Sequence, residues 1–251
     1  MAQQFPFPAD LGGGRPHHRT VDRIAAILEH VARQPRPQGL SEIAKAVGAP
    51  VSSTQSLVNG LVAAGFLTDD GRAFSLGLAP YLLSSLAGRQ PVDRVDHQIL
   101  EDIVAETGYI AVHAVLVGGN VYYLDYAAAD PSFEYLAQNR LRRSPLETSA
   151  GWVLLAGMPD DQLWGFLADL DPEEERLNAF QRAFPTIRET GECVAPKAAH
   201  NGADGVAVAV RSTQATPRVE AAVSVIATED EIEADAQHII EVLRRHEPRW
   251  N

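Results

Sequence analysis

Apolar residues in the first part of the chain recur at the three- and four-residue spacing of helices. The run from Val21 to Val31 predicts a helix with Thr20 as its N-cap, and the two prolines of RQPRPQG end it. A second, short helix is predicted from Ser41. A third is predicted over VSSTQSLVNGL, from Val51 to Leu61, after the glycine and proline of GAP.

Two short apolar runs follow in FLTDDGRAFSL, and the Asp-Asp-Gly between them has the composition of a β-hairpin turn. Three helices and a hairpin within about 60 residues, with a glycine between the second and third helices, predict a winged helix-turn-helix. The segment APYLLSSLAGRQP, from Ala79, is expected to form a linking helix that ends near Gly88.

The hydrophobic period changes in the second part of the chain. DRVDHQILEDIVAETG is amphipathic at helical spacing, but YIAVHAVLV and VYYLDYAA alternate with a period of two around GGN, which predicts a hairpin. SFEYLAQ is expected to be another strand, and GVAVAVRS and VEAAVSVIAT a second strand pair. ETSAGWVLLAG and DDQLWGFLADL predict short helices, EEERLNAFQRAFPTIRETG a longer one broken at Pro185, and Glu229 to Arg245 the last helix. Paired strands with helices packed on a face predict an α+β domain with an antiparallel sheet.

These patterns predict four parts of the chain. Residues 1–19, rich in Pro, Gly and Gln, are expected to be a flexible arm. Residues 20–80 are the winged helix-turn-helix, residues 81–91 the linker helix, and residues 92–251 a second domain.

The third helix has an unusual polar face made of Ser, Gln and Asn rather than Lys, Glu and Arg. Such side chains compete with the backbone for hydrogen bonds and are poor choices for a solvated helix. Gln and Asn can instead bond adenine, and Ser or Thr can bond bases or phosphates. The second helix of a helix-turn-helix is the element that enters the major groove. We therefore predict contacts with double-stranded DNA from Arg15, Arg19, Arg23, Ser41, Ser52, Ser53, Thr54, Gln55, Asn59 and Arg72.

Charge is distributed unevenly along the chain. The net charge of the whole chain is −12, whereas residues 15–80 carry seven Lys or Arg against five Asp or Glu, a net charge of +2. This asymmetry indicates two domains with different partners.

Several functional classes are disfavoured by the composition. The single cysteine, Cys193, excludes an internal disulfide framework and a multi-cysteine metal site. No apolar run reaches bilayer length and no secretory pattern opens the chain, so we expect a cytoplasmic protein with no membrane partner. Neither G-x-S-x-G, H-E-x-x-H, a P-loop nor G-x-G-x-x-G is present. We expect no catalytic residues, no metal and no cofactor.

The segment from TVDRIAAILEHV to LGLAPYLLSS resembles the DNA-binding domain of IclR-type bacterial transcriptional regulators. LRRSPLETSAGWVLLAG is similar to the family stretch that begins Pro-Leu-His, and GVAVAVRSTQATPRVEAAVSVIAT to its paired late strands. The resemblance implies a homodimer or a dimer of dimers, a palindromic operator, and a GAF-like effector-binding domain that takes a small organic molecule.

Two groups of residues depart from the family pattern. Val51 and Ser56 occupy positions where Lys or Arg is usual, so phosphate attraction is left to the arginines of the arm, the first helix and the wing. Glu147 and Trp152 replace the usual His and Lys. Positions that match ligand contacts in members binding small hydrophilic acids have mostly lost their polarity here. These positions are Ser149, Ala150, Gly151, Ala195, Gly205, Ser224 and Ile226.

The same positions favour an aromatic acid or a benzoyl amide as the effector. Amides at the start of the helix that opens at Ser149 can receive a carboxylate oxygen, and Gly205 and Ala195 leave room for a ring. His113 and Ser224 are predicted to bond a distal hydroxyl. The predicted ring neighbours are Tyr122, Leu124, Tyr126 and Trp152.

Two functions are consistent with these features. The first is a ligand-responsive DNA-binding transcriptional regulator, expected to repress a catabolic operon. The alternative is an effector-binding protein whose helix-turn-helix is a protein interaction module without specific DNA binding. The missing Lys and Arg on the third helix favour the alternative.

Overall fold

The structure is a computed structural model that describes residues 18–87, 95–130, 142–170, 172–194, 197, 202–212 and 218–250. The chain divides into two compact units, Met1–Gln90 and Pro91–Asn251. Each unit has its own hydrophobic core and is described separately. Among the described residues, no helix has both the length and the apolar character needed to cross a membrane.

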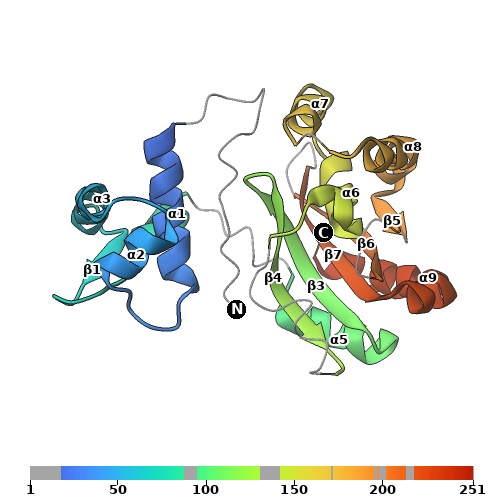
Figure 1. Cartoon of the computed structure of the whole chain (residues 1–251). Coiled ribbons are helices and arrows are strands. Elements are labelled where there is room, and N and C mark those ends of the chain that lie inside the picture. Colours follow the sequence, from blue (N-terminus) through green and yellow to red (C-terminus); the bar gives the residue numbers. More distant parts are fainter. Residues whose placement is uncertain are drawn as a thin grey trace. The chain divides into compact units, whose positions relative to one another are not determined.

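The first unit contains three helices, a two-stranded hairpin and a fourth helix (Figure 1). Its core is formed by Ile27, Val31, Ile43, Val58, Leu61, Leu67 and Phe74. The elements, in chain order, are α1 (Arg19–Arg33), α2 (Leu40–Ala46), α3 (Val51–Ala63), β1 (Leu67–Asp69), β2 (Phe74–Leu76) and α4 (Ala79–Leu86). This order confirms the predicted winged helix-turn-helix.

Two predicted helix starts are displaced, by two residues in α1 and by one in α2. Helix α1 has His18 rather than Thr20 at its N-cap position, without a side-chain cap bond. Helix α2 begins at Leu40, not Ser41, because Glu42 Oε2 accepts the Gly39 N–H at 2.8 Å and closes the first turn one residue earlier. Both differences concern local capping and leave the core-facing residues unchanged.

The second unit is built on a five-stranded antiparallel sheet with strand order β4-β3-β7-β6-β5. Its strands are β3 (Ile110–Val117), β4 (Asn120–Ala128), β5 (Glu192–Val194), β6 (Ala203–Arg211) and β7 (Val219–Thr228). Its helices are α5 (His97–Thr107), α6 (Ser149–Ala156), α7 (Asp160–Asp169), α8 (Glu174–Thr190) and α9 (Glu229–His246), with 3₁₀ turns at Pro145–Glu147 and Glu247–Arg249. The predicted α+β class with an antiparallel sheet is confirmed.

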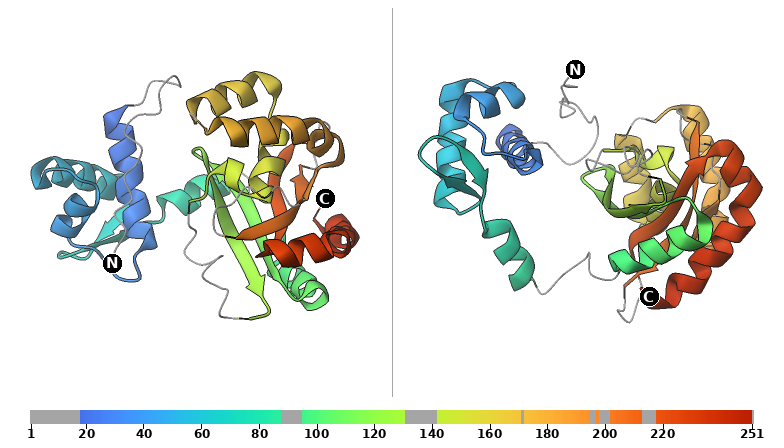
Figure 2. Two further views of the ribbon diagram at one scale, coloured as in Figure 1. Left: turned by 45° about the vertical axis from the view of Figure 1, so that its right-hand side comes forward. Right: turned by 90° about the horizontal axis from the view of Figure 1, so that it is seen from below.

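Helices cover both faces of this sheet (Figure 1, Figure 2). On one face α6, α7 and α8 enclose what we call the α6 core, which includes Val112, Leu155, Phe180 and Ala207. On the other face α5 and α9 enclose the α9 core, which includes Ile103, Val208, Val223, Ile239 and Leu243. Successive strand residues point alternately into the two cores. Each core is therefore lined by every second residue of the same strands.

Three features of this unit differ from the sequence prediction or are not tested by the structure. Helix α8 continues through Pro185, where a break was expected. Strand β5 was not predicted, although Cys193 pairs with Ala207 at the sheet edge. The expected strand SFEYLAQ lies entirely outside the described residues, so it stays a prediction.

Candidate functional site

Helix α3 presents its small polar side chains on the side away from its core. Val58 and Leu61 are buried, whereas Ser52, Ser56 and Asn59 are exposed. Pro50 precedes the helix, and no side chain caps its start. The first-turn N–H groups therefore share this end of the helix with the polar side chains, an arrangement suited to a phosphate or a base edge.

Two polar side chains on this face already bond each other. Gln55 Nε2 donates to Asn59 Oδ1 at 2.8 Å, one helical turn apart. This contact orients both side-chain amides and leaves each with further donor and acceptor capacity. The pair can therefore present a fixed hydrogen-bonding pattern to a partner outside the helix.

Thr54 does not belong to the exposed face, contrary to the prediction. Its side chain is buried, and its hydroxyl donates to the Pro50 carbonyl at 3.0 Å. Ser53 is half-buried and donates to the same carbonyl, also at 3.0 Å. Thr54 is one helical turn before Val58, so it faces the core rather than the groove of any bound DNA.

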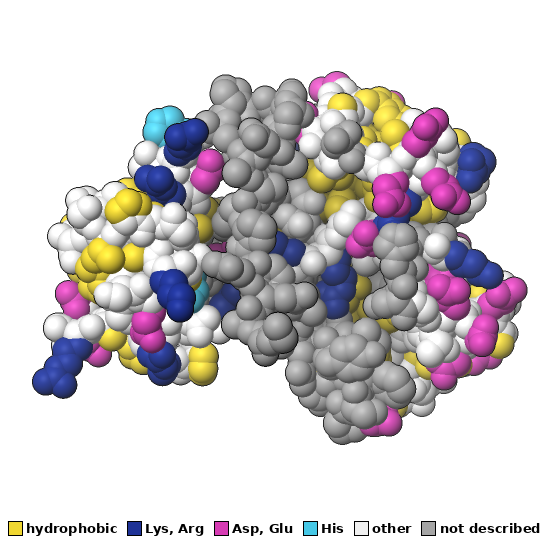
Figure 3. Space-filling model, viewed as in Figure 1, with side chains coloured by type: hydrophobic (Ala, Val, Ile, Leu, Met, Phe, Trp, Pro, Cys, Tyr) yellow, Lys and Arg dark blue, Asp and Glu magenta, His cyan; other side chains and the backbone are white. Residues whose placement is uncertain are grey.

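The predicted cationic contacts are spread over this unit. Arg19 and Arg23 are exposed on α1, Ser41 is exposed on α2, and Arg72 is exposed in the hairpin turn. Arg15 lies outside the described residues. On the visible faces, Lys and Arg side chains are scattered over the first unit, while Asp and Glu gather around α8 and α9 of the second (Figure 3).

The hairpin turn is held by its own aspartates. Asp70 Oδ1 accepts the N–H groups of Arg72 at 2.9 Å and Ala73 at 2.8 Å, and these bonds lower the pKa of the Asp70 carboxyl. Asp69 Oδ1 accepts the Gly71 N–H at 2.7 Å. Their carboxylates fix the turn that carries Arg72.

Four of the predicted effector residues lie together where α6 begins. Ser149 Oγ lies 3.0 Å from Ser224 Oγ, and both side chains are buried in the α6 core side of the sheet. A Cβ on Gly205 would lie 2.7 Å from Ser149 Oγ and 3.2 Å from Ser224 Oγ. Ile226 pairs with Gly205 across β6 and β7. These four residues form one buried cluster.

Tyr126 lies in the same cross-strand row as the serine cluster. It pairs with Val112, and Val112 pairs with Ser224 on the other side of β3. Tyr126 packs against the α6 core, as Ile226 does. An aromatic side chain thus stands two strands away from the Ser224 hydroxyl on the same face.

Three predicted effector residues lie on the opposite face of the sheet. Tyr122 and Leu124 pack against the α9 core. His113 lies between Val112 and Ala114, which belong to the α6 core, so its side chain points the other way. The prediction that His113, Tyr122 and Leu124 share a pocket with Ser224 is therefore wrong. A β-bulge between His113 and Ala114 also shifts the pairing with β4.

His113 is fully buried on that face. Burial lowers the pKa of its imidazole to about 4, and the charge of Asp125 across the strands only partly offsets this. Neither ring nitrogen has a hydrogen-bond partner within the described part of the chain. The ring is therefore neutral near pH 7.

The other α6 positions serve packing in this conformation. The Gly151 N–H donates to Thr148 Oγ1 at 3.0 Å, and a Cβ on Gly151 would lie 2.1 Å from the Pro145 carbonyl oxygen. Trp152 Nε1 donates to the Leu146 carbonyl at 3.0 Å. The Trp152 and Phe180 rings pack edge to face, with 5.6 Å between their centres. Ala150 is buried, and Ala195 lies outside the described residues.

Sequence reasoning missed Tyr123 and Arg143. The Arg143 guanidinium carbon lies 4.1 Å from the centre of the Tyr123 ring, and burial raises the pKa of that phenol. Tyr123 belongs to the α6 core, and the Arg143 backbone pairs with Val121. The period of two along β4 indicates that Tyr122 and Tyr123 lie on opposite faces of the sheet. It does not indicate which core each residue faces, so the sequence alone could not identify Tyr123.

The remaining candidates for chemistry are metal-ligating side chains and the single cysteine. In the described ranges, no group of three or more His, Cys, Asp or Glu side chains is placed to hold a metal ion. Cys193 is buried beside β6, and burial strongly raises the pKa of its thiol, which keeps the thiol protonated.

Comparison with known proteins relates both units to regulators. Residues 20–71 match the model of the IclR helix-turn-helix domain. The HTH-type transcriptional regulator TtgV of Pseudomonas putida is 26% identical over 156 residues, which cover 61% of this chain and 60% of TtgV. The match therefore spans less than two thirds of the relative.

Solved structures extend the likeness to most of the chain. An IclR family transcriptional regulator from Brucella abortus is 18% identical, with a TM-score of 0.63 and coverage of 96% of this chain and 97% of the other. An IclR homolog from Microbacterium hydrocarbonoxydans, solved in complex with 4-hydroxybenzoate, is 22% identical, with a TM-score of 0.61 and coverage of 89% and 97%. These likenesses confirm the fold in both units.

Proposed function

From the IclR helix-turn-helix domain that this chain carries, we propose that the protein is a ligand-responsive transcriptional regulator that binds double-stranded DNA. The observation that carries the proposal is the exposed polar face of α3. This helix is followed in the chain by the β1–β2 hairpin, which forms the wing. In a winged helix-turn-helix this helix enters the major groove. Such a protein acts where the DNA is, in the cytoplasm of a bacterium.

Base contacts are assigned to Ser52, Gln55 and Asn59. A side-chain amide can bond adenine through a donor and an acceptor, and a hydroxyl can bond a base or a phosphate. The phosphate or minor-groove contacts are assigned to Arg15, Arg19, Arg23 and Arg72. Further contacts with the DNA are assigned to Ser41 and Ser53. Because α3 itself has no cation, most electrostatic attraction comes from outside the helix.

We assign the exposed surface of α4 to a second copy of the chain. Helix α4 has no buried residue and exposes Tyr81 by 75% and Leu86 by 74%, and Leu78, just before the helix, is 78% exposed. Exposed apolar patches of this kind are typical of interfaces. A twofold dimer would present two copies of α3 to the two halves of a palindromic operator. A dimer of dimers would contain two such twofold dimers.

The effector is assigned to the α6 side of the sheet and to the class of aromatic acids or benzoyl amides. Ser149 and Ser224 offer hydroxyls, and Ile226 offers an apolar wall. The room predicted at Gly205 is already occupied, because a Cβ there would lie 2.7 Å from Ser149 Oγ and 2.8 Å from the Val225 carbonyl oxygen, so a ring requires these groups to shift. Of the predicted ring neighbours, Tyr126 packs on this face of the sheet, whereas Tyr122 and Leu124 pack on the other. The 4-hydroxybenzoate complex of the Microbacterium homolog supports this class, and a repressor of a catabolic operon would respond to such a compound.

A second candidate function is favoured by one observation. Helix α3 has neither Lys nor Arg in the thirteen residues from Val51 to Ala63. The helix-turn-helix would then be a protein interaction module attached to an effector-binding domain. An affinity for the operator no higher than the affinity for a scrambled duplex would support this alternative.

Fluorescence anisotropy with a labelled duplex from upstream of the gene tests both candidates. We expect specific binding that survives excess scrambled DNA and is weakened by 4-hydroxybenzoate but not by glyoxylate. Ser224→Ala should reduce the response to 4-hydroxybenzoate without changing ligand-free DNA binding. Equal affinity for operator and scrambled DNA would rule out the regulator. A response to glyoxylate alone would rule out the aromatic effector.

A further inference from the structure

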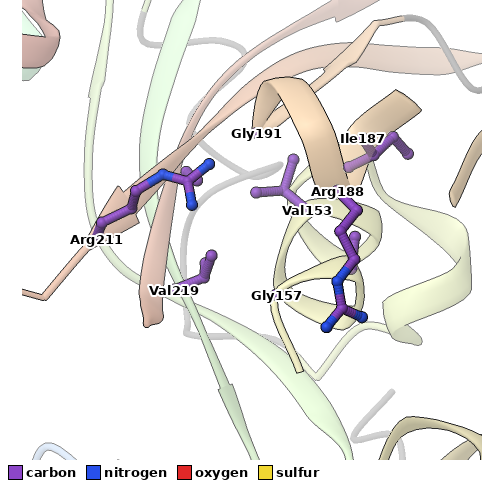
Figure 4. Close-up of a pocket in the computed structure, with 9 residues that line it drawn as sticks. Val153, Gly157, Ile187, Arg188, Gly191, Arg211 and Val219 are labelled. Atoms are coloured by element: carbon purple, nitrogen blue, oxygen red, sulfur yellow. The ribbon is translucent and has the colours of Figure 1, made fainter. Parts of the chain in front are cut away.

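A pocket of about 150 Å³ lies at the end of α6 opposite to Ser149 (Figure 4). Its apolar lining includes Val153 from α6, Ile187 from α8 and Val219 from β7. The serine cluster contributes none of the lining residues in the described part of the chain. The pocket is therefore separate from the proposed effector site, although both border the same helix.

Two glycines shape the walls of the pocket. Gly157, just after α6, would bring a Cβ to 2.4 Å from the Val219 Cβ. Gly191, which caps α8 with a φ of 76°, would bring a Cβ to 2.6 Å from Arg211 Nη2. Any side chain at either position would push into the pocket or displace its lining.

Two guanidinium groups from different elements line this space. Arg188 comes from the last turn of α8 and Arg211 from the end of β6. Figure 4 shows them on opposite sides, with Val153 and Val219 between them. Asp and Glu are both missing from the lining of this pocket among the described residues. Two cations beside an apolar floor are an uncommon feature on a unit whose charge is mostly negative.

Arg188 also contacts Asp160 and Phe184, and these contacts leave some of its N–H donors available. Its Nη1 donates to Asp160 Oδ1 at 2.6 Å, and its guanidinium carbon lies 5.3 Å from the centre of the Phe184 ring. Both Arg188 and Asp160 are exposed, so this ion pair contributes little and can exchange. A guanidinium has five N–H donors, and paired donors match the two oxygens of a carboxylate.

We propose that this pocket is a second small-molecule site, which binds a monocarboxylate no larger than benzoate. The carboxylate bonds Arg211 and Arg188, and the organic part lies against Val153, Ile187 and Val219. A cavity of about 150 Å³ admits a benzene-sized ring.

Methyl NMR of the whole chain separates this site from the effector site. Ile187 lines the pocket, whereas Ile226 belongs to the serine cluster, so their methyl signals report the two sites independently. Titration with benzoate should shift Ile187 in a saturable manner. A shift of Ile226 reports the effector site, so the failure of either proposal leaves the other measurable.

Arginine variants show whether the carboxylate is what binds. Arg211→Gln and Arg188→Gln should each weaken the Ile187 response about tenfold or more, as expected for a lost charge-assisted bond. Arg182→Gln is the matched control, because Arg182 is exposed on the same helix but does not line the pocket. Benzamide, which lacks the charge, should shift Ile187 far less than benzoate.

Three results would overturn the proposal. The first is an Ile187 signal that benzoate and acetate leave unchanged. The second is an equal response in the parent and both pocket variants. The third is an Ile187 shift that follows protein concentration instead of ligand, which would assign the pocket to an acidic side chain of another copy. If Arg211→Gln fails to fold, the exposed Arg188→Gln still decides the matter.

Discussion

Helices α3 and α6 begin with similar small polar residues, yet the two helices use them in opposite ways. In α3 the side chains of Ser52 and Asn59 are exposed, and only the core-facing side is buried. In α6 every residue from Ser149 to Ala156 is buried, and the Ser149 hydroxyl bonds Ser224 across the sheet. A polar helix start can therefore belong to a surface for an external partner or to the interior of a domain.

The difference also determines what each helix tolerates. An exposed hydroxyl is satisfied by water until a partner displaces it, so binding at α3 needs no rearrangement of the protein. A buried hydroxyl must have a protein or ligand partner. The bond between Ser149 and Ser224 uses one donor and one acceptor, so each hydroxyl keeps capacity for a further bond to an effector.

The sharpest test of this comparison adds one methyl group to each helix. We expect Gly151→Ala in α6 to lower the free energy of unfolding by about 3 kcal/mol, because the new Cβ would lie 2.1 Å from the Pro145 carbonyl oxygen. Gly60→Ala in α3 should raise it by about 1 kcal/mol, since nothing lies within 4 Å of the added atom. Urea unfolding of both variants measures these changes. Equal effects at the two positions would contradict the comparison.

The buried imidazole of His113 should make the second unit sensitive to acid. Its pKa is lowered to about 4 in the folded state, against an ordinary value near 6.5. The unfolded chain binds a proton below pH 6.5 that the folded chain refuses until about pH 4. Stability from the neutral ring is thus present above pH 6.5 and lost as the pH falls toward 4, by about 3 kcal/mol in total.

His113→Leu removes this titration and measures it. Between pH 7 and pH 4.5, the parent should lose about 2 kcal/mol more unfolding free energy than the variant. His238→Gln is the control, because His238 is exposed on α9 and should follow the parent. The same pH dependence in the parent and in His113→Leu would show that the folded imidazole accepts a proton as readily as the unfolded one.

The three-helix part of the first unit could be predicted well because only one side of α1, α2 and α3 is buried. The helical spacing of Val31, Val58 and Leu61 identifies buried positions correctly, and Asp-Asp-Gly marks the hairpin turn. The prediction for α1 was wrong at Val21, which has the same spacing but is 61% exposed, and it missed the fully buried Ile27. Thr54 was correctly predicted on the inner face of α3 but was also predicted to contact DNA. A threonine at a core-facing position looks polar in the sequence, but its bond to the Pro50 carbonyl lets the side chain be buried.

The site in the second unit could be predicted only in part because helices cover both faces of its sheet. Strand β3 is buried from Ile110 to Val115, so no polar alternation indicates which residues share a face. Ser149, Gly205 and Ser224 were found through the resemblance, and they do lie together. His113, Tyr122 and Leu124 were misassigned because the choice between two buried faces depends on the register and on the β4 bulge.

Gln55→Ala tests whether the exposed face of α3 reads bases. The substitution removes one side-chain amide and leaves Asn59 without its partner, so specificity should relax at one base position at a cost of about 1–3 kcal/mol. Thr54→Val is a control from the same helix, since it alters a buried bond and should change unfolding but not base preference. Competition binding with single-base operator variants measures both. An unchanged preference in Gln55→Ala would leave α3 without this role.

The smallest expected effect concerns Arg72 in the wing. Asp69 and Asp70 accept backbone N–H groups of the turn, so Arg72 is carried on a rigid tip and should reach a phosphate without ordering cost. Each neutralised phosphate adds close to one unit to the dependence of log affinity on log salt, so Arg72→Ala should flatten that slope by about one unit while leaving base preference intact. Anisotropy titrations at a series of salt concentrations give the slope. Lys45→Ala, at an exposed position on α2 that was assigned no contact, should leave the slope unchanged. If Arg72→Ala and Lys45→Ala give the parent slope alike, Arg72 is a solvated wing residue and the attraction to phosphate rests on α1 and the arm.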